Sequence, residues 1–160
     1  MGLPTDFYQS LFQQELVSPR SRRCREEVWR HTPLVQPSMQ EALMAPFTLI
    51  EMRDALMAID GQKCPGEDGL SRAFFTTFWD HIQQPLLGAF QQIFSSGQMP
   101  ESLSSSLICL IPKGGDRQEL RQWRPITLLT TAYKILAKMI SAKVRPLLPD
   151  LIHDTQTGFV

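Results

Sequence analysis

The sequence predicts an α+β fold that is mostly helical and carries one small antiparallel β-hairpin. Apolar residues recur at helical spacing through much of the chain, and one such segment begins with the capping-box residues Thr48 and Glu51. A short, continuous apolar run at residues 107–111 is instead typical of a buried strand. Two glycines follow this run and permit a tight turn, so residues 121–127 are predicted to return as the second strand.

The N-terminal part is predicted to contain a short helix within residues 1–17, followed by a linker at residues 18–46. The apolar side of this helix would consist of Phe7, Leu11 and Phe12. The linker is inferred from its four prolines, which are Pro19, Pro33, Pro37 and Pro46. It also carries a basic cluster of Arg20, Arg22, Arg23 and Arg25. This cluster has two interpretations: contact with a nucleic-acid backbone, or a solvated surface.

The first long helix is expected to begin after Thr48 and to run to about Asp60, where Gly61 would end it. Phe47 precedes the capping box and is placed to pack on Met52 as a hydrophobic staple. The inward-facing residues of this helix would be Met52, Leu56 and Ile59. A turn-rich loop is expected at residues 62–70.

Two further helices are predicted after this loop, the second of them beginning at Pro85 and ending before Gly97. The apolar side of the first would hold Phe74, Phe75, Phe78 and Ile82. The apolar side of the second would hold Leu86, Phe90, Ile93 and Phe94. We interpret these aromatic residues as core rather than as platforms for stacking bases.

Gly114 and Gly115 are expected to form the turn of the hairpin, and Pro125 indicates that the returning strand lies at an edge or ends there. Cys109, within the apolar run, is interpreted as a small core residue. A last helix, capped by Thr130 or Thr131, should extend to about Val144, with Pro146 and Pro149 ending it and a further turn or two at residues 147–152. Its apolar face would be Leu136, Met139 and Ile140, and the opposite face would be Lys134, Lys138 and Lys143.

The charges of the chain are balanced overall but unevenly distributed. Sixteen basic residues match sixteen acidic ones. Residues 41–106 carry eight acidic and three basic side chains, whereas residues 107–160 carry eight basic and four acidic ones. Any binding of nucleic acid must therefore be local, because no field of one sign covers the whole chain.

Several classes of function find no support in the sequence. The three cysteines, Cys24, Cys64 and Cys109, are far apart and form neither a C-x-x-C pair nor a cluster with histidine, which argues against a disulfide framework or a zinc site. The histidines accompany no recognisable nucleophile motif of a hydrolase. No stretch approaches the roughly 18 apolar residues of a membrane span, and no signal core opens the chain, so an intracellular protein, nuclear or cytoplasmic, is expected.

Lys113 and Arg124 are the residues that point most directly to chemistry. A hairpin would bring both to one end, where a lysine point charge and a planar guanidinium suit a triphosphate. Nucleotidyl transfer also requires divalent metal ions on carboxylates, and the sequence offers no carboxylate pair for this, so no catalytic residue is assigned. The other interpretation is two exposed surface cations.

Six sequence blocks occur in a specific order, and a seventh segment, Phe7–Phe12 (FYQSLF), lies upstream of them. The six are Lys63–Leu70 (KCPGEDGL), Met99-Pro100, Ile111–Asp116 (IPKGGD), Trp123–Leu129 (WRPITLL), Tyr133–Ile135 and Gln156–Val160 (QTGFV). Together they resemble blocks of the reverse transcriptases of non-LTR, LINE-type retrotransposons, and more distantly those of group II introns. The resemblance covers about two thirds of the chain, from Thr48 onward. It implies a partial reverse transcriptase domain at residues 47–160, comprising the fingers and their N-terminal extension without palm or thumb, preceded by an N-terminal segment and linker at residues 1–46.

The resemblance also implies roles for individual residues. Lys113 and Arg124 match the two cations of the fingers that bind the triphosphate of the incoming deoxynucleotide. The residues implied to border the RNA template are Pro65, Gly66, Asp68, Gly69, Pro125, Ile126, Lys134 and Lys138. Taken from the residues alone, Asp68 is a candidate cap for a helix starting near Ser71, and Lys134 and Lys138 could equally be a solvated helix face. Gln156, Gly158 and Phe159 match the junction with the palm, and an exposed apolar patch is expected around Ile126–Leu129 and Phe159.

The expected function is therefore that of a fragment of an RNA-directed DNA polymerase, inactive alone because the catalytic palm is missing. Its expected partners are an RNA template and a deoxynucleotide, with a palm-containing polypeptide as a further candidate and no membrane; Mg²⁺ is expected only together with the palm. Two alternatives stay open. One is a repurposed, non-catalytic module that binds RNA or DNA, and the other is a helical protein-interaction domain.

Overall fold

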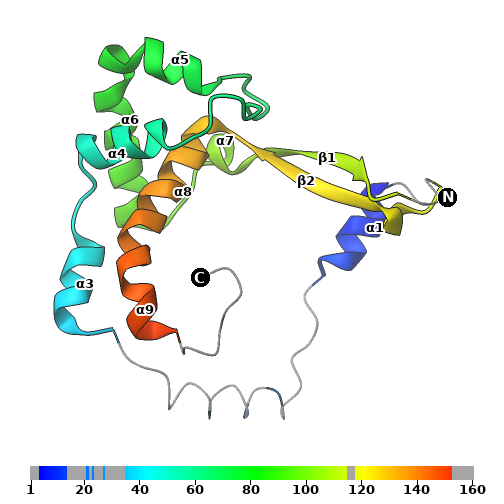
Figure 1. Cartoon of the computed structure of the whole chain (residues 1–160), viewed down its shortest axis with the longest axis horizontal. Coiled ribbons are helices and arrows are strands. Elements are labelled where there is room, and N and C mark those ends of the chain that lie inside the picture. Colours follow the sequence, from blue (N-terminus) through cyan, green and yellow to red (C-terminus); the bar gives the residue numbers. More distant parts are fainter. Residues whose placement is uncertain are drawn as a thin grey trace. The chain divides into compact units, whose positions relative to one another are not determined.

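The computed structural model describes residues 4–13, 21, 23, 27, 35–114 and 118–152. They form a mostly helical α+β fold with a single two-stranded antiparallel sheet, which confirms the predicted fold class (Figure 1). The chain divides into two compact units. The first combines Met1–Leu34 with Leu110–Pro125, and the second combines Val35–Cys109 with Ile126–Val160. Each strand of the hairpin contributes residues to both units.

Within the first unit, helix α1 (Pro4–Leu11) is grouped with the turn end of the hairpin. Its buried residue is Tyr8, which stacks on Phe12 at 6.2 Å and meets Phe7 edge-on at 5.1 Å between ring centroids. Leu11 and Phe12 are 60% and 68% exposed. The apolar side predicted for this helix is therefore largely exposed at Leu11 and Phe12, and the buried residue of α1 is Tyr8.

The predicted linker at residues 18–46 contains helix α3 (Pro37–Met44), so this part of the prediction was wrong. Pro37 was counted as a helix breaker, but it occupies the first turn, where its missing N–H has no intrahelical partner to lose. The residues that follow it are mostly good helix formers. Of the basic cluster, Arg23 is described and exposed, whereas Arg20, Arg22 and Arg25 lie outside the described residues.

Helix α4 (Leu49–Met57) begins at the predicted capping box. The N–H of Glu51 donates to the Thr48 hydroxyl at 3.2 Å, and the N–H of Thr48 donates to the Glu51 carboxylate at 2.7 Å. Met57 is the last residue of the helix, which is therefore shorter than predicted at its C-terminal end. The Asp60 carboxylate instead accepts from the N–H of Gln62 at 2.9 Å, which forms a separate turn.

Helix α5 (Arg72–Thr77) and helix α6 (Trp79–Ser96) meet at Phe78, whose φ of −99° and ψ of 17° interrupt the helical path. The prediction of a helix start at Pro85 was wrong, since Pro85 lies inside α6. A proline inside a helix removes one hydrogen bond and strains the preceding turn. The continuous apolar face of α6, which packs on one core, outweighs this cost. Gly97 ends α6 with a φ of 67°, as predicted.

The short helix α7 (Glu101–Ser104) leads into strand β1 (Ser106–Pro112), and strand β2 (Trp123–Leu129) follows the 3₁₀ helix η1 (Leu120–Gln122). The hairpin and its edge-strand Pro125 are confirmed, although the second strand begins and ends two residues later than predicted. Gly114 has a φ of 107°, and Gly115 of the predicted turn lies outside the described residues. The prediction that β1 is buried was wrong. Leu107, Ile108 and Ile111 are 47–54% exposed and Cys109 is exposed, because a sheet of two strands leaves much of both faces uncovered.

Helix α8 (Thr131–Val144) starts at Thr130, whose hydroxyl accepts from the N–H of Tyr133 at 3.2 Å. The 3₁₀ helix η2 (Arg145–Leu147) and the short α9 (Leu148–Leu151) continue it as predicted. Ile140 is 42% exposed, so it does not share the buried face of α8. Lys143 was placed on the outer face but is instead turned inward, with its ammonium 5.1 Å from the centroid of the Phe47 ring.

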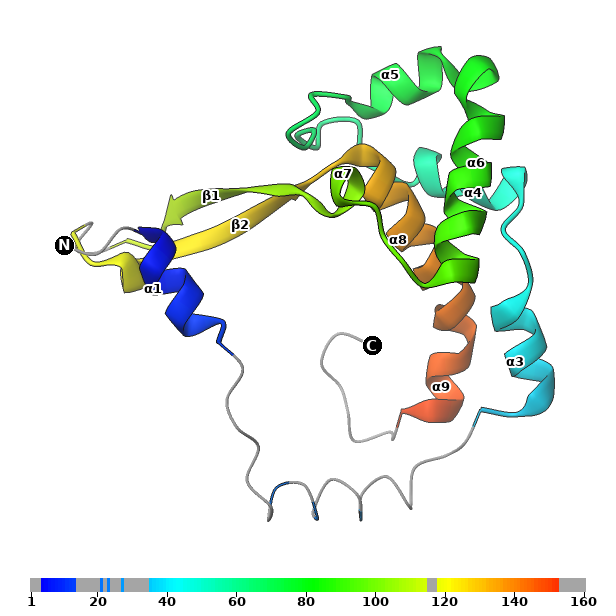
Figure 2. The same cartoon turned by 180° about the vertical axis from the view of Figure 1, so that it is seen from behind.

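The core of the second unit lies between α4, α6 and α8, which pack around one apolar cluster (Figure 2). Its fully buried members are Phe47, Met52, Leu56, Phe90, Ile135 and Met139. Phe47 and Met52, the two residues of the predicted staple, both belong to it. No helix among the described residues is long and apolar enough to cross a membrane.

Phe90 and Phe78 provide a matched test of this core. Replacing Phe90, which is fully buried, by alanine should lower the free energy of unfolding by about 3–5 kcal/mol. Replacing Phe78, which is 46% exposed, should lower it by about 1 kcal/mol or less. Urea denaturation of both variants measures the difference, and equal losses would contradict the described position of α6 in the core.

Candidate functional site

The turn end of the hairpin brings together the two cations that the sequence analysis singled out. The N–H of Lys113 donates to the carbonyl of Gln122 at 2.7 Å, which sets these residues opposite each other and places Ile111 opposite Arg124. Ile111 and Arg124 are both exposed, as expected for one face of a hairpin. Lys113 directly follows β1 and Arg124 is the second residue of β2, so both exposed cations belong to the turn end of the hairpin in the first unit.

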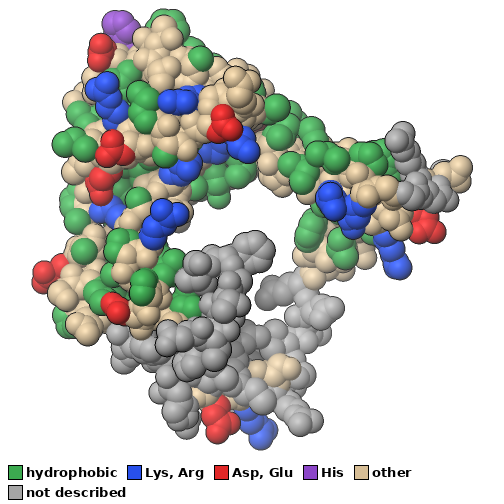
Figure 3. Space-filling view, in the orientation of Figure 1, with side chains coloured by type: hydrophobic (Ala, Val, Ile, Leu, Met, Phe, Trp, Pro, Cys, Tyr) green, Lys and Arg blue, Asp and Glu red, His purple; other side chains and the backbone are tan. Residues whose placement is uncertain are grey.

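The surroundings of Lys113 and Arg124 favour an anion. The Lys113 ammonium donates to the carbonyl of Arg121 at 2.9 Å, and an ammonium group carries three donors in all. Arg121 adds a third exposed cation on the same part of the chain, and Glu119 is the acidic residue described beside them. Figure 3 shows Lys and Arg side chains gathered around this end of the hairpin.

The loop at residues 63–70 lies against the start of α8 in the second unit, and Gly66 permits this contact. A Cβ at Gly66 would lie 2.5 Å from the backbone nitrogen of Thr130 and 2.8 Å from the carbonyl carbon of Leu129. Any side chain at this position would therefore collide with backbone. The close approach that a glycine was expected to allow is thus made within the chain.

Two side chains of α8 bind the same loop. The Lys134 ammonium donates to the carbonyl of Cys64 at 2.7 Å, and the Thr131 hydroxyl donates to the carbonyl of Leu70 at 2.6 Å. Sequence analysis named Thr131 only as a possible cap and missed this contact. No local pattern indicates it, since the two partners are 61 positions apart.

Asp68 does not cap helix α5, contrary to the prediction. Its carboxylate accepts from the N–H of Leu70 at 3.1 Å, an Asx turn, and Ser71 is the residue that precedes α5. The carbonyl of Gly66 accepts from the N–H of Gly69, whose φ is 68°. Asp68 therefore shapes the loop and lies too far from the helix to bind its first N–H groups.

The remaining candidate residues are distributed over both units. Pro125 is half-buried and belongs to the first unit, whereas Ile126, 40% exposed, belongs to the second. Lys138 is exposed on α8. Pro65 is half-buried beside Gly66. The expected junction residues Gln156, Gly158 and Phe159 lie outside the described residues. The part of the expected apolar patch that involves Phe159 is therefore not described either.

No metal centre is assembled by the part of the chain that the structure describes. Within it, no three His, Cys, Asp or Glu side chains are grouped closely enough to bind a metal ion.

Comparison with known proteins identifies the class to which these features correspond. The homologues of the chain are proteins of LINE-type transposons, in agreement with the resemblance of the sequence blocks. No family model matches the chain.

Three relatives illustrate this homology. A protein of transposon TX1 from Xenopus laevis, described as an uncharacterized 149 kDa protein, is 38% identical over 151 residues, or 94% of the chain. The RNA-directed DNA polymerases of the mobile element jockey from Drosophila funebris and Drosophila melanogaster are 29% and 27% identical over 69% and 67% of the chain. The chain spans only 11–12% of the length of these proteins.

The contact between Gly66 and Thr130 predicts opposite effects for two glycine substitutions. Gly66→Ala should lower the free energy of unfolding by about 1–3 kcal/mol, because the added methyl group meets backbone that cannot move aside. Gly88→Ala, within α6 and with nothing inside 4 Å of the added Cβ, should raise it by about 0.5–1 kcal/mol. Chemical denaturation of both variants tests this, and a neutral Gly66→Ala would contradict the contact.

Proposed function

We propose that this chain is the fingers region of a LINE-type reverse transcriptase and that its hairpin binds the triphosphate of the incoming deoxynucleotide. The observation that supports this most directly is that Lys113 and Arg124 are both exposed at the turn end of the hairpin. The names of the jockey relatives, which are RNA-directed DNA polymerases, support the reaction class.

The two cations have complementary tasks in this proposal. Transfer of a nucleotide builds negative charge on the departing pyrophosphate, and positioned cations stabilise that charge. The Lys113 ammonium acts as a compact point charge, and the Arg124 guanidinium binds two phosphate oxygens at once. The bond between Lys113 and the carbonyl of Arg121 directs the ammonium before the ligand arrives.

Most residues that would border the template in the same proposal belong to the second unit, and Pro125 belongs to the first. The loop with Pro65, Gly66, Asp68 and Gly69 and the residues Pro125 and Ile126 would border the RNA, and Lys134 and Lys138 would contact its phosphates. Mg²⁺ would be bound by carboxylates of a palm in the larger protein, because the described residues offer no group of ligands for it. Without that palm the chain would bind substrates and would not polymerise.

Binding of a fluorescent deoxynucleoside triphosphate tests the proposal. Lys113→Ala and Arg124→Ala should each weaken binding about tenfold or more, since each removes a charge-assisted bond to phosphate. The double variant should bind the fluorescent triphosphate only as weakly as nonspecific surface cations do.

A matched control is Arg53→Ala, which removes one exposed cation of the second unit. It should leave triphosphate binding within about twofold of the unaltered chain, as expected for screened surface charges. If the Arg53, Lys113 and Arg124 substitutions lowered triphosphate affinity equally, the hairpin cations would act only as surface charges, and the proposal would be refuted.

A protein-interaction role is the second candidate, and the exposed apolar side chains of the hairpin favour it. Leu107, Ile108 and Ile126, which belong to the second unit, are 40–54% exposed. Exposed apolar side chains of this kind can be covered by another protein. The two roles are compatible, because the apolar residues and the cations are different side chains of the same hairpin.

A further inference from the structure

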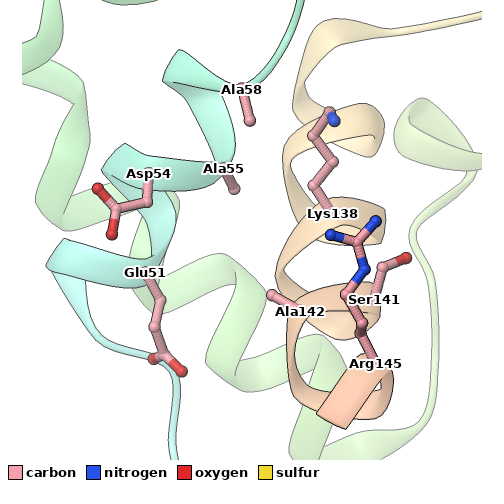
Figure 4. Close-up of a pocket in the computed structure, with 8 residues that line it drawn as sticks. All are labelled: Glu51, Asp54, Ala55, Ala58, Lys138, Ser141, Ala142 and Arg145. Atoms are coloured by element: carbon pink, nitrogen blue, oxygen red, sulfur yellow. The ribbon is translucent and has the colours of Figure 1, made fainter. Parts of the chain in front are cut away.

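A groove between α4 and α8, with a volume of about 320 Å³, is a separate feature of the second unit (Figure 4). Its floor is formed by small side chains, and its walls carry charged ones. The lining residues are Glu51, Asp54, Ala55, Ala58, Lys138, Ser141, Ala142 and Arg145. Sequence analysis placed Lys138 on a helix face but did not consider Arg145.

The acidic residues of the groove are occupied or turned away. One carboxylate oxygen of Glu51 lies 3.6 Å from the Lys143 ammonium, and the other accepts the N–H of Thr48 in the capping box. The carboxylate of Asp54 points away from α8 (Figure 4). The α4 wall therefore directs little negative charge into the groove.

The α8 wall is cationic. Lys138 and Arg145 are exposed, and neither forms an ion pair with a residue that the structure describes. They are seven positions apart, so they lie on one side of the helix about 10 Å from each other along its axis. Lys134 lies on the same side one turn before Lys138, which extends the row of cations toward the loop at residues 63–70.

We propose that this groove binds the phosphate backbone of a single nucleic-acid strand, with Lys138 and Arg145 contacting separate phosphates. The small floor gives a strand room to enter. It presents no aromatic side chain on which a base could stack, so the contact is with the backbone and is independent of base sequence. This inference rests on the proposed function, in which Lys138 already contacts template phosphates, and extends it by the groove and by Arg145.

The test is the binding of a short, fluorescently labelled oligouridine to the full 160-residue chain, measured by anisotropy at several salt concentrations. Arg145→Gln and Lys138→Gln should each weaken binding about fivefold or more. The slope of log affinity against log salt should become shallower by about 0.7 for each phosphate that the variant no longer neutralises. Ala142→Trp keeps the charge but fills the groove, and it should weaken binding to a similar extent.

Arg53→Gln is the matched control. It removes the same charge from an exposed arginine of α4 that does not line the groove, and it should change affinity less than about twofold. The inference is overturned if Arg145→Gln and Arg53→Gln act alike, or if Ala142→Trp binds normally. It is also overturned if sedimentation shows that the groove variants abolish self-association and leave RNA binding unchanged.

Triphosphate binding, measured on the same samples, separates this inference from the proposed function. Loss of RNA binding in the groove variants with normal triphosphate binding supports the groove. If the groove variants bind RNA normally while triphosphate binding depends on Lys113 and Arg124, the groove inference is overturned and the proposed function stands. An unaltered chain that binds neither ligand at low salt overturns both.

Discussion

The contact between Gly66 and the backbone of Thr130 is the constraint on which the second unit depends. It joins three elements at one point: the loop at residues 63–70, the end of β2 and the start of α8. Thr130 begins α8 by capping it, and the next residue, Thr131, binds the loop in return. The position of α8, and with it the direction of Lys134, follows from a backbone approach that only glycine permits.

At the other end of α8, Lys143 connects the helix to α4 and to the segment before it. Its ammonium donates to the carbonyl of Ala45 at 2.6 Å, lies 3.6 Å from the Glu51 carboxylate and faces the Phe47 ring. Glu51 thus takes part in the capping box and in this ion pair together. Among the described residues, Lys138 and Arg145 form no ion pair, whereas Lys143 forms one with Glu51.

Predictions from the sequence were correct where the predicted feature depends on residues only a few positions apart. The capping box at Thr48, the cap at Thr130 and the left-handed end at Gly97 are determined by neighbouring backbone groups. They failed where competing contacts come from distant segments. Pro85 looked like a helix start, and the packing of α6 on the core overrides it.

The sequence by itself determined the fold class, the hairpin with its two cations and the kinship with LINE-type transposon proteins, because each rests on residue identity at short spacing. Only the tertiary structure decided the exposure of β1, the partners of Gly66 and Thr131, and the groove between α4 and α8. These features depend on which surfaces meet across the chain. No periodicity or motif in the sequence indicates the hydrogen bond between Leu70 and Thr131, which are 61 positions apart.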